Sequence, residues 1–412
     1  MTVVPWSSAR LSVVCSALRT ENFMVNATTN QNSATNPHDT PQSNAKRVRY
    51  AVVGLGYIAQ VAVLPAFKHA QENSELVALI SDDETKRAKL AKKYSVRKTY
   101  RYEQYADCLA NGEIDAVYIA LPNHMHRVYT EGAAEAGIHV LCEKPMAVTE
   151  EECESMIDAA ARANVKLMIA YRLHFERGNL DAIAAIREGK IGEPRIFHSE
   201  FCQQVAPGNI RLKSELGGGP LYDIGVYCIN ASHYLFQAEP EEVFAYAASK
   251  KDDSRFNEVS EMSCALMRFA GDRLAEFTCS FGAADRSAYE VIGTEGVLKM
   301  DPAYEMVGVL KRELIRGGRS QKTKYKKRDQ FGPELVYFSR CVLDNTDPEP
   351  GGKEGMADVR IVRALLESQD KNRPVRISPV GELTRPSEEQ EIYKPPVEKP
   401  RLVKAAAPSK EG

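Results

Sequence analysis

The sequence has no excess of charge of one sign and no long apolar run. Its 54 basic and 56 acidic residues give a formal net charge of −2, which argues against a dedicated nucleic-acid binder because such proteins show a basic excess or stripe. The densest basic run, residues 324–328, is short and typical of a solvated loop or strand end. No apolar stretch reaches the roughly 18 residues that a membrane span needs. The composition, 43% hydrophobic and 27% charged, is that of an ordinary globular protein.

A paired cysteine motif is also missing. None of the nine cysteines belongs to a Cys-x-x-Cys pair, and several, such as Cys142, lie in apolar runs. This pattern is typical of free thiols in a reducing compartment, not of a disulfide framework or a zinc site. Residues 11–18 are weakly apolar but short for a secretory signal, and residues 26–45 are polar and of low complexity. We therefore expect a disordered extension over residues 1–45 and a cytoplasmic protein.

Residues 46–170 alternate short apolar runs with amphipathic helical patterns. Repeats of one strand and one helix predict βαβ crossovers, and hence a doubly wound parallel sheet, the Rossmann type of α/β domain. The predicted strands are residues 48–53, 76–81, 116–120, 139–142 and 166–170.

Residues 171–380 have a different pattern, with several strands joined by short turns, which indicates an antiparallel meander. We predict an α+β domain with a large open sheet, closed by two helices near residues 332–344 and 354–369. Residues 381–412 are rich in Pro, Lys and Glu and predict a flexible tail. The predicted strands of the meander are residues 242–248, 261–269, 273–281, 288–293 and 296–300.

A G-x-G-x-x-A motif, residues 54–59, directly follows the first predicted strand and opens a helix. Gly54 permits the tight turn, Gly56 lets a pyrophosphate approach the backbone, and Ala59 allows the next helix to pack closely on the strand. At the end of the second strand, Ser81 with Lys86 could hold a ribose 2′-phosphate, whereas Asp82 would select NAD if the register slips by one. The sequence thus predicts a dinucleotide site, with NADP favoured over NAD.

Two further clusters carry candidate catalytic groups. Lys144 follows the predicted strand 139–142, at the sheet edge where α/β ligand sites lie, and Pro145 restricts its backbone. Asp223 and Tyr227 are four residues apart at a helix start, so they share a face. Taken separately, Lys144 could be a solvated lysine, Asp223 a helix cap and Tyr227 a core residue.

Five segments, in this order, resemble the Gfo/Idh/MocA family of oxidoreductases. They resemble most the branch with glucose–fructose oxidoreductase, dimeric dihydrodiol dehydrogenase and NADP-dependent xylose dehydrogenases. The resemblance covers residues 47–380 and implies that Lys144, Asp223 and Tyr227 are active-site residues. The segments are GLGYIA (54–59), LPNHMH (121–126), CEKPMAV (142–148), YRLHFERGN (171–179) and GGGPLYDIGVYCIN (217–230).

The resemblance implies hydride exchange between nicotinamide and a sugar or polyol carbon. Tyr227 is then the first choice for the acid/base group, since a nearby Lys144 cation would favour its ionised form, and Asp223 would orient a substrate hydroxyl. The family also implies a homodimer or homotetramer formed through the second sheet. The alternative is a non-catalytic sensor of dinucleotide or sugar with the same fold.

Further residues are expected around these groups. Tyr171, Arg172 and His174 should border the sugar pocket, because their loop leaves a strand at the same edge. The pair His124 and His126 lacks nearby acidic or cysteine ligands, so we predict no metal site. The other expected cofactor contacts are Tyr57, Ile58, Leu121, Pro122, Asn123, His126, Glu143 and Lys144.

Overall fold

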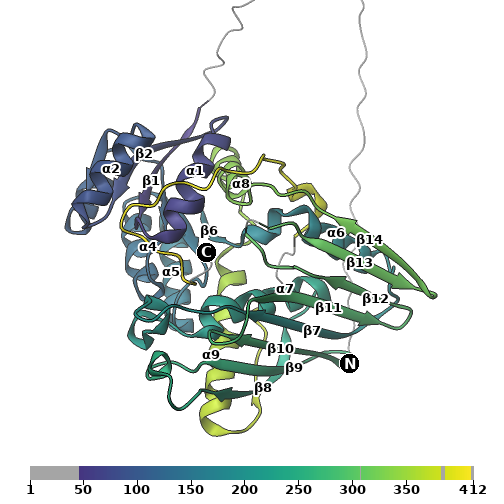
Figure 1. Ribbon diagram of the computed structural model, residues 1–412. Coiled ribbons are helices and arrows are strands. Elements are labelled where there is room, and N and C mark those ends of the chain that lie inside the picture. The colour runs from purple at the N-terminus through teal and green to yellow at the C-terminus, as the bar shows by residue number, and fades with distance from the viewer. Residues whose placement is uncertain (1–45, 307, 382–385, 410–412) are drawn as a thin grey trace, which may run out of the picture. The chain divides into compact units, whose positions relative to one another are not determined.

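The apolar runs of the N-terminal half form a six-stranded parallel sheet in the order β3-β2-β1-β4-β5-β6 (Figure 1). The computed structural model describes residues 46–306, 308–381 and 386–409; the extension predicted over residues 1–45 lies outside them. The strand order is that of the Rossmann fold, in which ligands bind beyond the carboxyl ends of the strands. The strands are β1 (Val48–Val53), β2 (Ser74–Ile80), β3 (Lys98–Tyr100), β4 (Ala116–Ile119), β5 (His139–Glu143) and β6 (Leu167–Ala170).

Helices flank this sheet, and capping residues in the sequence explain where several of them begin and end. In α5, Thr149 and Glu152 form a capping box, and Asn164 ends the helix in the left-handed conformation. In α2, the Asp83 side chain accepts the backbone N–H of Lys86 and so caps the first turn. The helices are α1 (Leu64–Ala66), which continues the π-helical stretch η1 (Ala59–Val63), α2 (Glu84–Tyr94), α3 (Tyr105–Ala110), α4 (His126–Glu135) and α5 (Glu150–Ala163).

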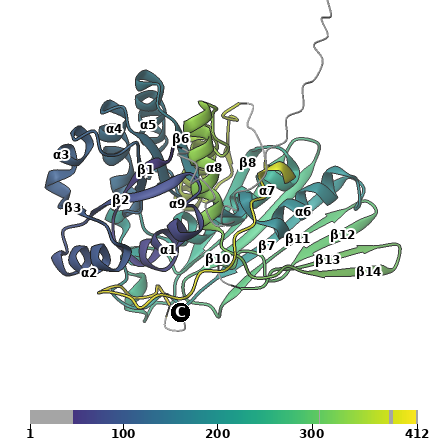
Figure 2. The same ribbon diagram turned by 90° about the horizontal axis from the view of Figure 1, so that it is seen from above.

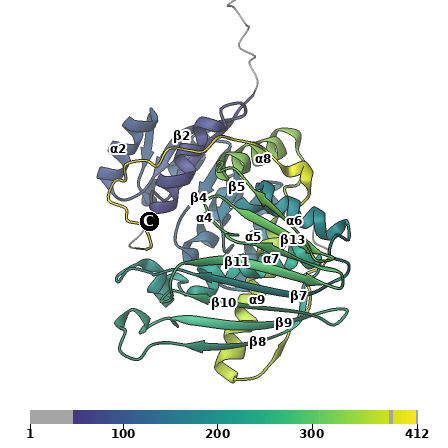
Figure 3. The ribbon, with the colours of Figure 1, turned by 45° about the vertical axis from the view of Figure 1, so that its right-hand side comes forward.

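The second half forms a nine-stranded sheet in the order β14-β13-β12-β11-β7-β10-β9-β8-β15. Its pairs are antiparallel except for β7 with β10, which run parallel. Alternate residues of β9 are buried and exposed, so one face packs on helices and the other is open (Figure 3). The strands are β7 (Pro194–Cys202), β8 (Pro240–Ala248), β9 (Met262–Phe269), β10 (Arg273–Ser280), β11 (Arg286–Gly293), β12 (Gly296–Met300), β13 (Lys311–Arg316), β14 (Arg319–Lys324) and β15 (Val375–Arg376).

The helices of the second half are α6 (Arg177–Arg187), α7 (Val226–Phe236), α8 (Phe331–Asp344) and α9 (Gly352–Lys371). We expected the last two to close the second domain, but α8 packs on the Rossmann sheet. Phe338 shares a core with Val52, and the Tyr50 hydroxyl lies 2.7 Å from Ser339 Oγ. Helix α9 contacts both α5 and β8, so it lies between the two sheets (Figure 2). Each described helix is too short or too polar to cross a bilayer.

Residues 386–409 follow a defined path, which the prediction of a flexible tail did not anticipate. Gln390 is buried and donates to the backbone oxygen of Glu349. Further along, Val403 exchanges hydrogen bonds with the Gln60 side chain, and Ala206 donates to the oxygen of Pro408. The segment thus runs from the second half of the chain back along the Rossmann helices (Figures 1 and 2).

Candidate active site

A cavity of about 770 Å³ lies at the carboxyl ends of the Rossmann strands, the size of a small-molecule site. It brings together segments that are far apart in the sequence, from the glycine loop to the C-terminal segment. Of the residues predicted from the sequence, those that line it are Gly54, Gly56, Tyr57, Ile58, Ser81, Lys86, Leu121, Pro122, Asn123, Glu143, Lys144, Arg172, Asp223 and Tyr227.

The glycine loop is shaped for a dinucleotide. Gly54 has φ +92°, and a Cβ there would lie 2.4 Å from the oxygen of Ala120, so the neighbouring strand leaves room only for glycine. A Cβ on Gly56 would meet nothing within 4 Å, and its backbone faces the cavity. Ala59 is fully buried behind the loop, where it packs the helix on the strand. The open backbone beside a helix start fits a pyrophosphate.

The residues predicted to contact the ribose, Ser81 with Lys86 or Asp82, follow the end of β2. Ser81 and Lys86 line the cavity, whereas Asp82 does not. Its Oδ1 instead accepts the backbone N–H of Tyr102 at 2.9 Å. Asp82 therefore lies outside the cavity lining, and its carboxylate holds the next loop. The Ser81 hydroxyl and the Lys86 ammonium group remain at this part of the cavity, the ribose corner, and such a pair suits a phosphate.

The loop after β4 lines the cavity with Leu121, Pro122 and Asn123. Asn123 Nδ2 donates to the oxygen of Gly217 at 2.8 Å, so it joins this loop to the one before α7. His126, expected to touch the cofactor, is fully buried outside the cavity lining. Its ring nitrogens lie 2.9 Å and 3.0 Å from the oxygens of Leu121 and Pro145. His126 therefore fixes the spacing of two loops that line the site.

Lys144 lines the cavity and contacts both of the other predicted catalytic residues. Its Nζ donates to the backbone oxygen of Asp223 at 2.7 Å and lies 3.8 Å from Asp223 Oδ1. The same atom is 4.5 Å from the ring centroid of Tyr227. The Lys144–Pro145 peptide bond is cis. The structure thus brings together the three predicted catalytic residues, which are up to 83 positions apart.

Glu143 is mostly buried and accepts the Tyr118 hydroxyl at 2.9 Å. Burial raises the pKa of its carboxyl.

Asp223 has partners that the sequence did not indicate. Its Oδ2 accepts Arg211 Nε at 2.6 Å and Gln203 Nε2 at 3.2 Å. Burial opposes ionisation, but the charges of Arg211 and Lys144 outweigh it, so the pKa of Asp223 lies below its ordinary value. A Cβ on Gly218 would lie 2.5 Å from the oxygen of Arg211, so this glycine lets the Arg211 loop close on the helix start.

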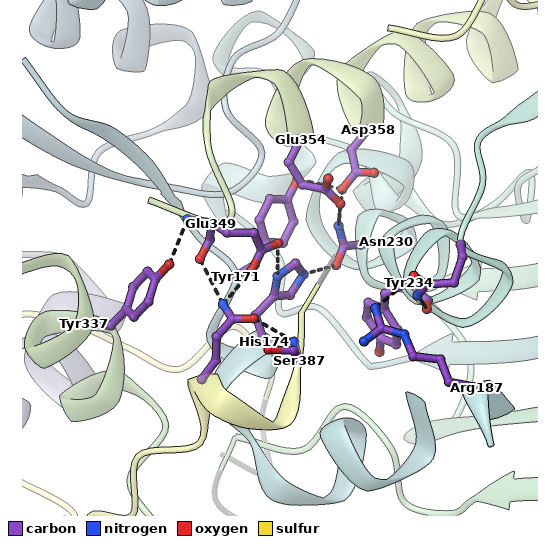
Figure 4. A network of polar contacts seen from close by, with 12 residues as sticks. Tyr171, His174, Arg187, Asn230, Tyr234, Tyr337, Glu349, Glu354, Asp358 and Ser387 are labelled. Carbon is purple, nitrogen blue, oxygen red and sulfur yellow. Dashed lines mark hydrogen bonds and ion pairs between the residues drawn. The ribbon is translucent and has the colours of Figure 1, made fainter. Parts of the chain in front are cut away.

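The loop after β6 divides between the site and the core. Arg172 lines the cavity, with its Cζ 5.1 Å from the Tyr227 ring centroid. Tyr171 and His174, predicted to border the sugar pocket, do not line it. The Tyr171 hydroxyl donates to Asp358 at 2.6 Å, and the His174 ring lies between Glu349 and Asn230 (Figure 4). Tyr171 and His174 are buried in contact with α7, α9 and the residues before α9, and Arg172 is the predicted residue of this loop that lines the cavity.

Sequence reasoning missed several cavity residues, and only weak signals existed for them. Gln203 follows the end of a predicted strand. The glycine run 217–219 predicts that another segment packs closely on it, but the sequence does not show that this segment contains Arg211. Residues 404–408, which also line the cavity, carry no recognisable motif. Within the described part of the chain, no three His, Cys, Asp or Glu side chains are grouped to hold a metal ion.

The geometry combines a dinucleotide cradle with an ammonium, a phenol and an ion-paired carboxylate around one space. This is the arrangement of a nicotinamide-dependent oxidoreductase, in which a proton moves as hydride is transferred. Comparison with protein families agrees. Residues 48–171 match the oxidoreductase family with an NAD-binding Rossmann fold, and residues 180–299 match the GFO/IDH/MocA C-terminal domain. The chain belongs to the Gfo/Idh/MocA family of oxidoreductases.

Similar proteins act on sugars and related compounds. The chain is 33% identical to D-xylose 1-dehydrogenase [NADP(+)] of Haloarcula marismortui, over 80% of this chain and 93% of that protein. It is 29% identical to trans-1,2-dihydrobenzene-1,2-diol dehydrogenase of Danio rerio, over 62% and 75%. The crystal structure of aldose–aldose oxidoreductase from Caulobacter crescentus, complexed with glycerol, superposes with a TM-score of 0.77 at 34% identity, covering 81% of this chain and 100% of that one.

Proposed function

We propose that the protein is an NADP-dependent oxidoreductase that transfers hydride between nicotinamide and a sugar or related polyol. The observation that carries the proposal is the meeting of Lys144, Asp223 and Tyr227 at one cavity with the Gly54–Gly56 loop. The relatives support the substrate class, since those named above act on xylose, aldoses or a dihydrodiol. Ser81 and Lys86 at the ribose corner support NADP.

When bound, the nicotinamide supplies or accepts the hydride, and residues of the chain donate or accept the proton. The Tyr227 hydroxyl is the proposed acid/base group for the reacting oxygen. The Lys144 ammonium lies over its ring, where positive charge stabilises the negative charge that develops as the proton leaves. Lys144 can also polarise a carbonyl oxygen directly. Asp223, held ionised by Arg211, accepts a substrate hydroxyl and orients it.

The non-catalytic sensor is the weaker alternative. Loss of the EKP lysine or of the acid/base residue would indicate it, and this chain keeps Lys144, Asp223 and Tyr227 at one cavity. The relatives named above are enzymes.

We also propose a homodimer or homotetramer formed through the open face of the nine-stranded sheet. Apolar side chains are unusually exposed there: Leu274 is 55% exposed, Leu266 50% and Ile196 42%. They lie on the adjacent strands β9, β10 and β7, with Leu274 opposite Ile196 in the register. A cytoplasmic location belongs to the same proposal, supported by the free thiols of all the described cysteines.

Fluorescence titration of the purified protein with NADPH and NADH tests the cofactor end. We expect tighter NADPH binding, weakened by Ser81→Asp because the added carboxylate repels the 2′-phosphate. Asp82→Asn is the matched control and should leave the preference unchanged, because Asp82 faces the Tyr102 backbone. A preference for NADH that depends on Asp82 would contradict the NADP assignment. Binding of neither dinucleotide would overturn the proposed function.

A panel of aldoses, ketoses, inositols and dihydrodiols with NADP(H) then tests the substrate class. Turnover that falls in Lys144→Ala supports the proposal; no turnover with any polyol, despite tight NADPH binding, would refute it.

A further inference from the structure

The C-terminal segment is anchored beside the glycine loop by a buried glutamine. Gln60, which is 1% exposed, lies in the helix that follows this loop. Its Oε1 accepts the N–H of Val403 at 2.8 Å, and its Nε2 donates to the Val403 oxygen at 3.0 Å. Leu402 and Val403 also pack against the Rossmann core. A buried amide that uses both its donor and its acceptor on one backbone residue specifies that position strongly.

Beyond this anchor the chain crosses to the other side of the cavity. Residues 404–408 line it together with the glycine loop. The oxygen of Pro408 then accepts the N–H of Ala206 at 2.8 Å, in the loop between β7 and the Arg211 turn. The stretch is therefore held at both ends, on the cofactor side by Gln60 and on the substrate side by Ala206. The two family matches end at residues 171 and 299, well before this stretch.

Lys404 lies at the ribose corner of the cavity. Its Nζ is 3.4 Å from Asp83 Oδ2, and the N–H of Asp83 donates to Ser81 Oγ at 3.3 Å. Lys404, Ser81 and Lys86 all line the cavity. The Lys404 side chain is 59% exposed, so its ion pair with Asp83 is weak and can exchange for a stronger anion. A phosphate with nearly two negative charges is such an anion.

We propose that residues 404–408 are part of the dinucleotide site. Lys404 is a second cation, beside Lys86, for the ribose 2′-phosphate, and residues 405–408 form a strap that slows release of the bound dinucleotide. The inference rests on the proposed function and adds to it a binding residue and a means of retaining the cofactor between turnovers.

The test compares dissociation of NADPH and NADH from the full chain and from three variants. A chain that ends at Val403 keeps the Gln60 anchor and the packing of Leu402 and Val403, but loses the strap. Lys404→Ala removes only the charge, and Lys399→Ala is the matched control, an exposed lysine earlier in the same segment. Circular dichroism and thermal melting verify that each variant is folded.

Stopped-flow displacement should show NADPH leaving the truncated chain about tenfold faster, which corresponds to loss of the strap contacts. Lys404→Ala should weaken NADPH binding about fivefold, the scale of an exposed charge pair, and leave NADH binding nearly unchanged. Lys399→Ala should match the wild type. Limited trypsin digestion gives a second measurement: NADPH should slow cleavage after Lys404 in the wild type.

Three results would overturn the inference. If the wild type binds NADPH tightly and the truncated chain releases it at the same rate, there is no strap. If Lys404→Ala weakens NADPH and NADH equally, or neither, Lys404 does not contact the 2′-phosphate. If the wild type binds neither dinucleotide, the proposed function fails and this inference fails with it, a result distinct from the first two.

Discussion

Lys144 is held by groups that come from one short segment, residues 223–227. The Asp223 backbone oxygen accepts a hydrogen bond from the Lys144 ammonium, the Asp223 carboxylate lies 3.8 Å away, and the Tyr227 ring faces the same ammonium. Arg211 occupies the other carboxylate oxygen, so Asp223 is shared between two cations. The Lys144 ammonium has three N–H donors, and one of them is used by the Asp223 backbone oxygen. Asp223 Oδ1, at 3.8 Å, is too far for a hydrogen bond. Lys144 can therefore still donate to a substrate oxygen.

This arrangement makes a residue-scale prediction. Lys144→Ala and Tyr227→Phe should each lower turnover about 100-fold or more, the scale of general acid–base loss, while NADPH binding persists. Steady-state kinetics with the best substrate of the panel measures kcat and KM separately. Tyr222→Phe is the control, since the Tyr222 hydroxyl donates to the Val148 oxygen outside the cavity. Near-normal turnover in both active-site variants would refute the assigned roles.

At the scale of elements, a buried polar network joins the turn after β6 to α7 and α9 (Figure 4). His174 Nε2 lies 2.8 Å from Asn230 Oδ1, and Asn230 Nδ2 donates to Asp358 at 3.0 Å. On its other side, His174 Nδ1 lies 3.0 Å from Glu349. Tyr227 lies in the first turn of α7 (Val226–Phe236), so the network fixes the helix that carries the acid/base group without touching the cavity.

The charge of His174 should make this network sensitive to pH. Burial lowers the pKa of the imidazole, but Glu349, with Glu354 and Asn230, outweighs it, and the net pKa is raised above the ordinary 6.5. A raised folded-state pKa stabilises the fold fully below 6.5, and this contribution is lost as pH rises through the folded value. The stability gap between wild type and His174→Gln should therefore be larger near pH 6 than near pH 9.

Urea unfolding at the two pH values measures this gap. In a Glu349→Gln background the dependence of the gap on pH should shrink, because the carboxylate that favours the charged imidazole is gone. A gap that grows with pH would show that His174 is neutral in the folded protein.

At the scale of the whole described unit, the two sheets have unlike surroundings. The Rossmann sheet is covered by helices, including α8 from the C-terminal part of the chain. The nine-stranded sheet has one face uncovered, and that face mixes apolar residues such as Leu274 with charged ones such as Glu276 and Arg268. Exposed apolar residues gathered on one sheet face mark a protein–protein contact surface.

The assembly prediction follows from this face. Replacing Leu266 and Leu274 together by Lys should weaken the proposed dimer at least ~100-fold, since about 1.4 kcal/mol corresponds to tenfold and each buried leucine contributes about 1.5–3 kcal/mol. Sedimentation equilibrium measures it. Gln321→Lys, at an exposed position of β14, adds the same kind of charge away from the patch and should leave assembly unchanged. A monomeric wild type, or an unaffected double variant, would contradict the prediction.

The sequence by itself determined the parts of this protein that depend on local pattern. Apolar runs between helical segments predicted the strands β1, β2, β4, β5 and β6, because a buried parallel strand needs a continuous apolar run. Gly54 and Gly56 marked the dinucleotide loop, since only their backbone allows it. The family resemblance supplied Lys144, Asp223 and Tyr227 together, where each alone was ambiguous.

Only the tertiary structure decided which other side chains reach the cavity. Arg211, which no sequence motif indicated, lines the cavity, whereas His174, which was predicted to border it, is buried beside Glu349 and Asn230. Nothing in the composition of residues 381–412 predicted that Val403 pairs with Gln60, 343 positions earlier. The physical reason is that side-chain direction at the end of a loop, and the docking of a segment without periodicity, are set by long-range packing and by buried polar groups that need partners.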